Sequence, residues 1–293
     1  MNTALLDPLF APLGARRFFA RHWPDRILAT HGPLSRLPLQ KKSLVDVEAM
    51  LAGLERPVTL YETNTGYSTK KITPERALLA YARGRTVRVD AADDLRADLK
   101  RYVEALAEGA GLPGRAPLAY AQAFYSPVGP ALPIHFDPAE VVVIQLRGKK
   151  RWRLWGATVD APTETVVSGA ALGPDMLQVQ PDLAVPEGPP AADVTMRPGS
   201  VLFVPRGTWH STEALTPSAS ISFVLATPPR LDLLLEQLRT ELLTDVEWRT
   251  PAYGALGDAA SARKAARAMG DLAVKRQRAT DLLERARAQS RLK

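Results

Sequence analysis

The stretch that decides the fold runs from Ile134 to Trp155 and reads IHFDPAEVVVIQLRGKKRWRLW. It holds two short runs, Val141–Leu146 and Arg151–Trp155, that are rich in β-branched and aromatic residues. A turn sequence around Gly148 separates the two runs. Runs of this length and composition, bounded by turn residues, predict two β-strands.

These strands belong to a longer β-rich segment between Leu118 and Thr227. Short apolar runs alternate there with turn sequences such as SPVGP, RPGS and PRGT. The further predicted strands are Leu118–Tyr125, Met176–Gln180, Asp193–Met196, Val201–Val204 and Ser220–Leu225. Loops are predicted at Thr158–Gly173 and Pro181–Ala192. Several short strands at this spacing indicate a barrel or a sandwich.

Segments with helical patterns lie on both sides of the β-rich segment. Residues 1–117 combine predicted helices with two short strands, Arg26–Thr30 and Thr86–Val89, and are expected to pack on the core formed by residues 118–227. Residues 228–293 are expected to form a helical extension that is basic at its end. The predicted fold class is therefore mainly β, with N-terminal helices and a C-terminal helical segment.

The composition limits the kind of protein and the kind of site. No apolar run approaches the roughly 18 residues that a membrane span needs, and the first residues lack the basic and apolar regions of a secretory signal. We therefore expect a cytoplasmic protein without a membrane partner. The sequence contains no Cys, so a metal would have to be held by imidazole and carboxylate groups.

The net charge of +7 is concentrated near the C-terminus. Residues 257–293 contain ten Lys or Arg against four Asp or Glu, and their Ala, Leu and Arg content favours a helix. Two interpretations of this basic segment stay open. It contacts an acidic partner such as nucleic acid or a ribosome, or it is a solvated helix face.

A candidate metal site comes from the histidines. Residues i and i+2 of an extended chain point to the same face, so His135 and Asp137 can face one cavity together. His210, after the sequence RPGSVLFVPRGTW, is the candidate third ligand. Two imidazoles and one carboxylate form the facial triad of non-haem iron(II) oxygenases, but the same groups also bind manganese, nickel or zinc.

The alternative is a buried histidine that is hydrogen-bonded to a neighbouring aspartate without any metal. The turn–strand–turn–histidine pattern that ends at His210 favours the metal site. The other two histidines, His22 and His31, have no carboxylate at a useful spacing. We expect both to be structural or exposed.

Lys150 stands out within the second strand of the deciding stretch. Strand alternation places Lys150, Trp152 and Leu154 on one face, which two large apolar side chains mark as the inner face. A buried, unpaired ammonium group is strongly destabilising, so an inward Lys150 requires an anion. The alternative is that Lys150 lies at the strand end and extends its ammonium group into water.

The deciding stretch, together with RPGSVLFVPRGTWHSTEAL at residues 197–215, resembles the motifs of the JmjC-type cupin hydroxylases, in particular their ribosomal-oxygenase branch. The residues of the first motif that carry the resemblance are His135, Asp137, Glu140, Gln145, Gly148, Lys150 and Trp152. The resemblance implies a double-stranded β-helix (a cupin or jelly-roll barrel). It also implies Fe(2+) and 2-oxoglutarate as cofactors.

The resemblance also implies roles for individual residues. His135, Asp137 and His210 correspond to the catalytic iron ligands. Lys150 and Ser126 fall on positions that bind the distal carboxylate of 2-oxoglutarate. The two further cofactor-site candidates are Gln122, where some members carry Asn near the metal, and Ser220, at a strand position that lines the pocket in relatives.

The implied function is an iron(II)- and 2-oxoglutarate-dependent dioxygenase that hydroxylates a side chain of a protein or peptide, with a ribosomal protein as the substrate that this branch suggests. The other hypotheses are a hydroxylase of a small molecule or of a modified nucleic-acid base, and a non-catalytic metal-binding cupin. Longer members follow the barrel with a dimerisation helix bundle and a winged-helix domain. The residues after Thr227 are expected to form a shortened helical extension, through which a homodimer could form.

Overall fold

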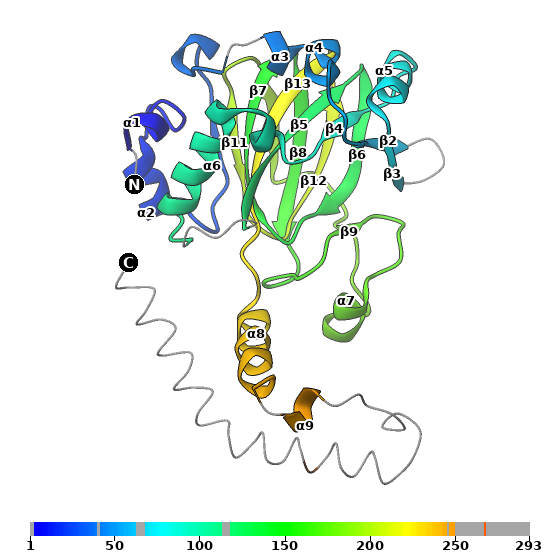
Figure 1. Cartoon of the computed structure of the whole chain (residues 1–293). Helices are drawn as coiled ribbons and strands as arrows, with labels where there is room; N and C mark the ends of the chain where they lie inside the picture. Colours follow the sequence, from blue (N-terminus) through cyan, green and yellow to red (C-terminus); the bar gives the residue numbers. More distant parts are fainter. Residues whose placement is uncertain are drawn as a thin grey trace. The chain divides into compact units, whose positions relative to one another are not determined.

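The computed structural model describes residues 3–39, 42–62, 68–112, 118–244, 246–249 and 267. The chain divides into two compact units, Met1–Thr227 and Pro228–Lys293. The first unit contains two antiparallel β-sheets that face one another, as Figure 1 shows. Two facing sheets of short antiparallel strands make the predicted cupin barrel, and the fold class is confirmed.

The larger sheet has eight strands. In spatial order they are β1 (Leu28–Thr30), β11 (Val201–Val204), β7 (Glu140–Arg147), β13 (Ser218–Leu225), β5 (Ala119–Ser126), β4 (Val87–Val89), β2 (Val58–Glu62) and β3 (Ser68–Ile72). The smaller sheet consists of β10 (Ala192–Met196), β8 (Lys150–Ala157), β12 (Thr208–Ala214), β6 (Gly129–Phe136) and β9 (Val166–Val167). Strands far apart in the sequence thus lie side by side, as with β1 and β11.

The two faces of the larger sheet have different partners. One face, with Ile221 and Phe223 of β13, belongs to the main apolar core together with residues of the N-terminal helices. The α-helices that precede β5 are α1 (Thr3–Leu6), α2 (Ala15–Arg21), α3 (Lys42–Val45), α4 (Val47–Leu51), α5 (Pro74–Ala82) and α6 (Ala97–Gly109). The alternate residues Ser220 and Ser222 line the cavity between the sheets, because successive side chains of a strand point to opposite faces.

One predicted strand is wrong. Residues Met176–Gln180 lie largely in helix α7 (Pro174–Val179). Pro174 occupies the first turn, where a missing N–H costs nothing, and the backbone N–H of Met176 donates to Glu164 Oε2 at 3.2 Å. The apolar residues of MLQV therefore do not mark a strand: only Met176 is buried, whereas Leu177 and Val179 are exposed.

Helix α7 and strand β9 belong to the long connection between β8 and β10, residues 158–191, which we call the β8–β10 arm. This segment was predicted as loops around one strand. It instead has a small apolar core of its own. The buried members of this core are Phe136, Trp155, Val159, Val166, Met176 and Trp209. Three of them come from barrel strands, so the arm is fixed to the smaller sheet.

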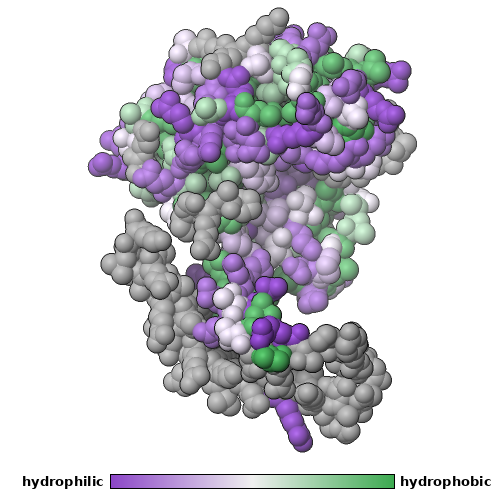
Figure 2. Space-filling model, viewed as in Figure 1, coloured by the Kyte–Doolittle hydropathy of each residue, from purple (hydrophilic) through white to green (hydrophobic). Residues whose placement is uncertain are grey.

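The second unit contains α8 (Arg230–Leu242) and α9 (Val246–Arg249). No residue of α8 is buried, and Leu231, Leu233 and Leu235 are exposed. The basic segment at 257–293 lies outside the described residues, except for Arg267. Within the described part of the chain, no helix has the length and apolar character to cross a membrane. In Figure 2 the visible face of the first unit is mostly hydrophilic, with apolar groups scattered among polar ones.

Candidate active site

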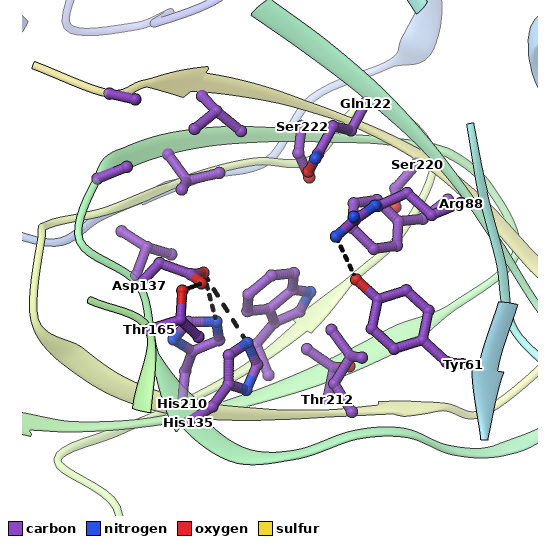
Figure 3. A pocket seen from close by; sticks show the side chains of 18 of the residues that line it. Tyr61, Arg88, Gln122, His135, Asp137, Thr165, His210, Thr212, Ser220 and Ser222 are labelled. Carbon is purple, nitrogen blue, oxygen red and sulfur yellow. Dashed lines mark hydrogen bonds and ion pairs between the residues drawn. The ribbon is translucent and has the colours of Figure 1, made fainter. Parts of the chain in front are cut away.

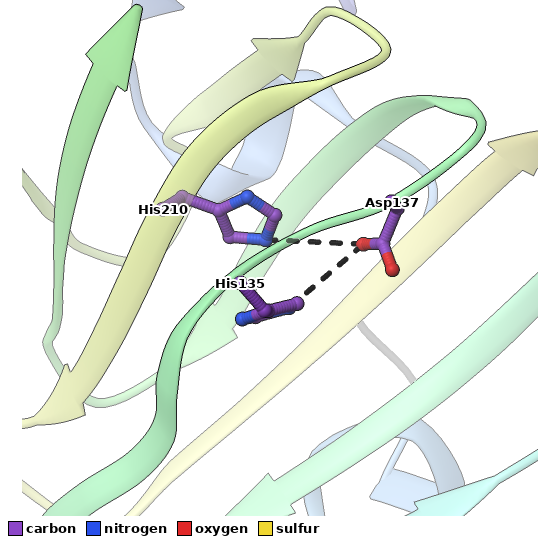
Figure 4. A group of neighbouring side chains, drawn as sticks. All are labelled: His135, Asp137 and His210. Carbon is purple, nitrogen blue, oxygen red and sulfur yellow. Dashed lines mark ion pairs between the residues drawn. The ribbon is translucent and has the colours of Figure 1, made fainter. Parts of the chain in front are cut away.

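The structure brings His135, Asp137 and His210 together. His135 on β6 and His210 on β12 are direct cross-strand partners, and their ring centroids are 4.1 Å apart. Asp137 follows the last residue of β6. Its Oδ2 atom lies 3.9 Å from Nε2 of each histidine, as Figure 4 shows. One candidate ligand atom from each residue lies within 4.8 Å of the other two.

The backbone fixes the orientation of both imidazoles. Nδ1 of His135 lies 2.8 Å from Pro133 O, and Nδ1 of His210 lies 2.9 Å from Thr208 O. A carbonyl oxygen can only accept, so each Nδ1 carries a proton and donates it. Burial, and then the neighbouring His135, lower the pKa of His210. The His210 ring is thus neutral near pH 7, and its Nε2 lone pair points toward Asp137.

These three side chains fit a divalent transition metal. Two neutral imidazole nitrogens and one carboxylate oxygen are the donors that such ions bind. Both histidines are 4% exposed, which leaves the donor atoms little freedom. Among the described residues, no other group of three or more potential ligands is this close together. Three protein ligands would leave further coordination positions of a bound ion open.

The three residues open into a cavity of about 280 Å³ between the two sheets, shown in Figure 3. Lys150, Gln122 and Ser220, three of the predicted cofactor-site residues, line this cavity. The fourth, Ser126, does not line it. Ser126 is fully buried opposite Ser218, and the hydroxyl groups of both have no hydrogen-bond partner among the described residues.

Lys150 points inward, as strand alternation predicts. Lys150, Trp152 and Leu154 are all buried, whereas Arg151 and Arg153 are not. The ammonium group of Lys150 lies 5.6 Å from the centre of the Phe124 ring, and no described carboxylate forms an ion pair with it. Burial lowers the pKa of Lys150 to about 8. A cation in this position favours the binding of an anion inside the cavity.

Two cavity residues, Arg88 and Tyr61, were not predicted from the sequence. They come from β4 and β2, outside the segment that carries the sequence motifs. The guanidinium group of Arg88 lies 5.4 Å from the Tyr61 ring centre, and it hydrogen-bonds the Tyr61 hydroxyl. A signal did exist in the sequence TVRV: Arg88 alternates with Val87 and Val89, so it lies on the face opposite two core residues.

Asp90, directly after β4, forms ion pairs and hydrogen bonds with several residues on this side of the cavity. Its Oδ1 lies 2.6 Å from Arg88 Nε and accepts a hydrogen bond from Gln122 Nε2 at 3.1 Å. Its Oδ2 accepts hydrogen bonds from Thr59 and Lys71, both at 2.6 Å. Burial raises the pKa of Asp90, but Arg88, Lys71 and Thr59 outweigh burial, and the pKa is lowered. An ionised Asp90 thus positions both Gln122 and Arg88.

The fold and this site together define a class of protein: a cupin barrel with a candidate metal site between its two sheets. Residues 116–233 match the family model of the JmjC domain. Among known proteins, the uncharacterized protein YxbC of Bacillus subtilis is 27% identical over 262 residues, which cover 85% of this chain and 79% of YxbC. Ribosomal oxygenase 2 of Rattus norvegicus is 38% identical over 96 residues, which cover 32% of this chain and 17% of that protein.

A solved structure shows the same fold. The structure of YcfD, a ribosomal oxygenase from Escherichia coli in complex with cobalt and 2-oxoglutarate, matches with a TM-score of 0.55 and 16% identity. The match covers 78% of this chain and 55% of the YcfD chain. The predicted resemblance to JmjC-type oxygenases of the ribosomal-oxygenase branch is confirmed by these matches. The chain spans only part of these oxygenases.

Proposed function

We propose that this protein is an iron(II)- and 2-oxoglutarate-dependent dioxygenase that hydroxylates a side chain of a protein or peptide. The observation that carries this proposal is the shared cavity of the His135–Asp137–His210 group and Lys150. A dicarboxylate that binds a metal at one end can neutralise a buried lysine with the other. The 2-oxoglutarate in the YcfD complex is such a dicarboxylate.

Each residue then has a defined task. His135, Asp137 and His210 would hold iron(II), and Lys150 would bind the distal carboxylate of 2-oxoglutarate. When bound, this pair supplies the oxidation of a substrate C–H group by O₂, with release of succinate and carbon dioxide. The hydroxyl groups of Ser126 and Ser220 would be further candidate donors to the cosubstrate. Ser126 does not line the cavity itself, but it lies on the same face of β5 as Gln122 and Phe124, which do.

The other side of the cavity would receive the substrate. Gln122 and Arg88 are held there by Asp90, so their polar atoms have fixed positions before any ligand arrives. Fixed groups of this kind orient a substrate with little loss of conformational entropy. A ribosomal protein is the first substrate class to test, because two of the matched proteins are named ribosomal oxygenases.

Two other functions compete with this proposal. A small molecule or a modified nucleic-acid base could be hydroxylated in the same cavity, and substrate analysis distinguishes these cases. A non-catalytic metal-binding cupin would have no use for a buried cation beside the metal. Lys150, which has no carboxylate partner among the described residues, therefore speaks against it.

The organisation of the whole chain is also part of the proposal. Residues 118–227 would be the catalytic core, and residues 1–117 would complete the barrel and its cavity through β2 and β4. Residues 228–293 would serve association, either as a homodimer or through contact of the basic end with nucleic acid. We place the protein in the cytoplasm.

The test begins with binding and ends with the substrate. Manganese(II) and then 2-oxoglutarate are titrated without oxygen into the wild type, His135→Ala and Asp137→Ala, followed by crystallisation of the complex. Loss of a ligand should weaken metal binding by more than the roughly 10–100-fold that loss of an outer partner costs. Equal metal content in all three proteins would exclude the site.

Mass spectrometry then compares ribosomal proteins from a deletion strain and from its parent. The proposal predicts one oxygen atom fewer on a ribosomal protein in the deletion strain. Identical masses, with succinate formation retained by the purified enzyme, would exclude a ribosomal protein as the substrate. They would favour a small-molecule or nucleic-acid substrate instead.

A further inference from the structure

Asp137 differs from the other two candidate ligands in its surroundings. It follows the end of β6 and is not part of the strand, and its side chain is 35% exposed. Its backbone carbonyl accepts a hydrogen bond from Gly207 N at 3.0 Å, which fixes the main chain but not the carboxylate. A carboxylate with this freedom can turn away from a metal or bind it through both oxygens. Some other contact must therefore select one orientation.

Thr165 supplies that contact. Its Oγ1 donates a hydrogen bond to Asp137 Oδ1 at 3.3 Å, whereas Oδ2 of the same carboxylate faces the two histidines. Figure 3 shows the threonine beside Asp137 at the edge of the cavity. The two oxygens thus have different neighbours: one faces the metal site and the other is held by the protein.

Strand β9 explains why Thr165 lies there. Val167 pairs with His135 and Val166 with Phe136, so the residue that precedes β9 lies next to the residue that follows β6. A further backbone hydrogen bond, from Ser168 N to Ile134 O at 2.8 Å, extends the pairing. The register of two short strands thus places Thr165 beside Asp137.

The β8–β10 arm also packs against both ligand strands, on the face opposite to the one that carries the histidines. Phe136 lies between His135 and Asp137 in sequence, and Trp209 precedes His210. Their rings pack edge to face at 4.7 Å inside the core of the arm. Trp209 Nε1 donates to Thr158 Oγ1 of the arm at 2.8 Å. Movement of β9 relative to β6 is therefore resisted by packed side chains.

From this geometry we propose that Thr165 is a positioning residue of the metal centre, which holds Asp137 with one oxygen directed to the metal. The inference rests on the proposed function, because it requires a metal at the His135–Asp137–His210 group. Hydrogen bonds to ligating carboxylates typically change metal affinity by about 10–100-fold. The distance of 3.3 Å and the exposed position place Thr165 at the lower end, with about a tenfold loss on its removal.

Cobalt(II) titration of the full chain tests the proposal, with visible absorption reporting the ligand arrangement. Thr165→Val should raise the cobalt dissociation constant about tenfold and change the absorption band, whereas Thr165→Ser, which keeps the hydroxyl, should restore both. Thr163→Val is the matched control. Thr163 lies on the same arm but donates to Asp175 at 3.1 Å, a residue outside the group of candidate ligands.

The outcomes distinguish a failure of the Thr165 inference from a failure of the proposed function. Cobalt affinity of Thr165→Val within twofold of the wild type overturns the inference and leaves the metal site intact. An equal loss in Thr163→Val overturns it too, because the arm would then act only as a structural support. If the wild type and Asp137→Ala bind cobalt alike, the proposed metal site fails, and the role of Thr165 fails with it.

Discussion

Lys150 shows how much chemistry a single side chain can indicate. A charged lysine that is only 2% exposed and lacks a described carboxylate partner is unfavourable in the free protein. Lys149, the preceding residue, lies in the turn before β8 and is exposed. The two lysines are thus a natural matched pair, identical in chemistry and opposite in burial.

We therefore expect Lys150→Met to weaken 2-oxoglutarate binding about 100-fold, because a charge-assisted contact to a buried carboxylate contributes about 2–3 kcal/mol. Manganese affinity should change little, since Lys150 is not among the metal-ligand candidates. Calorimetric titration of both variants measures the two affinities. A larger effect in Lys149→Met would refute the assignment of Lys150 to the cosubstrate.

The charge of Lys150 also predicts a pH dependence. Its pKa is lowered to about 8, so the ammonium form predominates at pH 7 and is lost as the pH rises through that value. The affinity for 2-oxoglutarate should fall about tenfold between pH 7 and pH 9 in the wild type. Lys150→Arg stays protonated throughout this range, so its profile should be flat. A flat wild-type profile would show that the cosubstrate does not depend on this cation.

The site residues that could be predicted from the sequence are those whose spacing along one strand is informative. His135 and Asp137 follow the two-residue period, and so do Lys150 and Trp152. Asp90 could not be recognised in this way. It gains its importance from Lys71 on β3 and Gln122 on β5, and no local pattern reveals which strands will be neighbours. Thr165 was missed for the same reason, since it lay in a predicted loop.

At the scale of elements, the turn between β7 and β8 determines on which face of β8 the side chain of Lys150 lies. Gly148 has φ of +70°, and a Cβ atom there would lie 2.2 Å from the backbone oxygen of Pro217. A side chain would be strained by the backbone angle and would also clash with a neighbouring turn. Gly169 has φ of +79° with nothing within 4 Å of an added Cβ, so it isolates the first of these two effects.

Gly169→Ala should destabilise the protein by about 1–2 kcal/mol, the cost of a left-handed backbone for a residue with a Cβ atom. Gly148→Ala should cost roughly 2–5 kcal/mol, because overpacking adds to the backbone strain. Urea unfolding followed by circular dichroism measures both values. Equal losses in the two variants would mean that the turn relaxes without disturbing Pro217.

The Asp90 network connects residues of four strands, β2, β3, β4 and β5, which makes its carboxylate more important than an ordinary surface charge. Asp90→Asn should reduce the free energy of unfolding by about 1–3 kcal/mol, because Arg88 and Lys71 lose a partly buried partner. The folded-state pKa is lowered, so the contribution is complete above the ordinary Asp pKa near 4 and disappears as the pH falls below it. The difference between wild type and variant should shrink accordingly in acid.

Asp94 provides the control for Asp90. It pairs with Arg56 at 3.3 Å, but its side chain is 67% exposed. Asp94→Asn should therefore change the stability by less than about 0.5 kcal/mol. A similar loss in both variants, measured by urea unfolding at pH 7, would show that Asp90 is only a surface charge.

Elements with strong local signals were predicted well, and elements defined by tertiary pairing were not. The runs at Val141–Leu146 and Ser220–Leu225 lie within β7 and β13. Strand β6 was not predicted as a strand, because Pro130 and Pro133 give it the composition of a turn. Helix α7 was mistaken for a strand because a few residues with one buried side chain fit either period.

At the scale of the molecule, the basic segment after Leu256 is a prediction from charge and composition. Deletion of residues 257–293 should either convert a dimer to a monomer or abolish salt-sensitive binding to ribosomes. Light scattering distinguishes the first outcome, and co-sedimentation at two salt concentrations distinguishes the second. Unchanged mass, activity and partners would show that the segment is a solvated helix face.

The antiparallel pairing of β1 with β11 has a consequence for how the protein is made. Leu28 pairs with Phe203, and Phe18 of α2 packs edge to face on the same Phe203 at 5.0 Å. At a synthesis rate of about 5–20 residues per second, roughly 10–35 seconds separate the translation of these partners. Throughout that interval the larger sheet that covers the apolar side chains of the N-terminal helices is incomplete. The nascent chain must therefore stay protected from aggregation until its last barrel strands leave the ribosome.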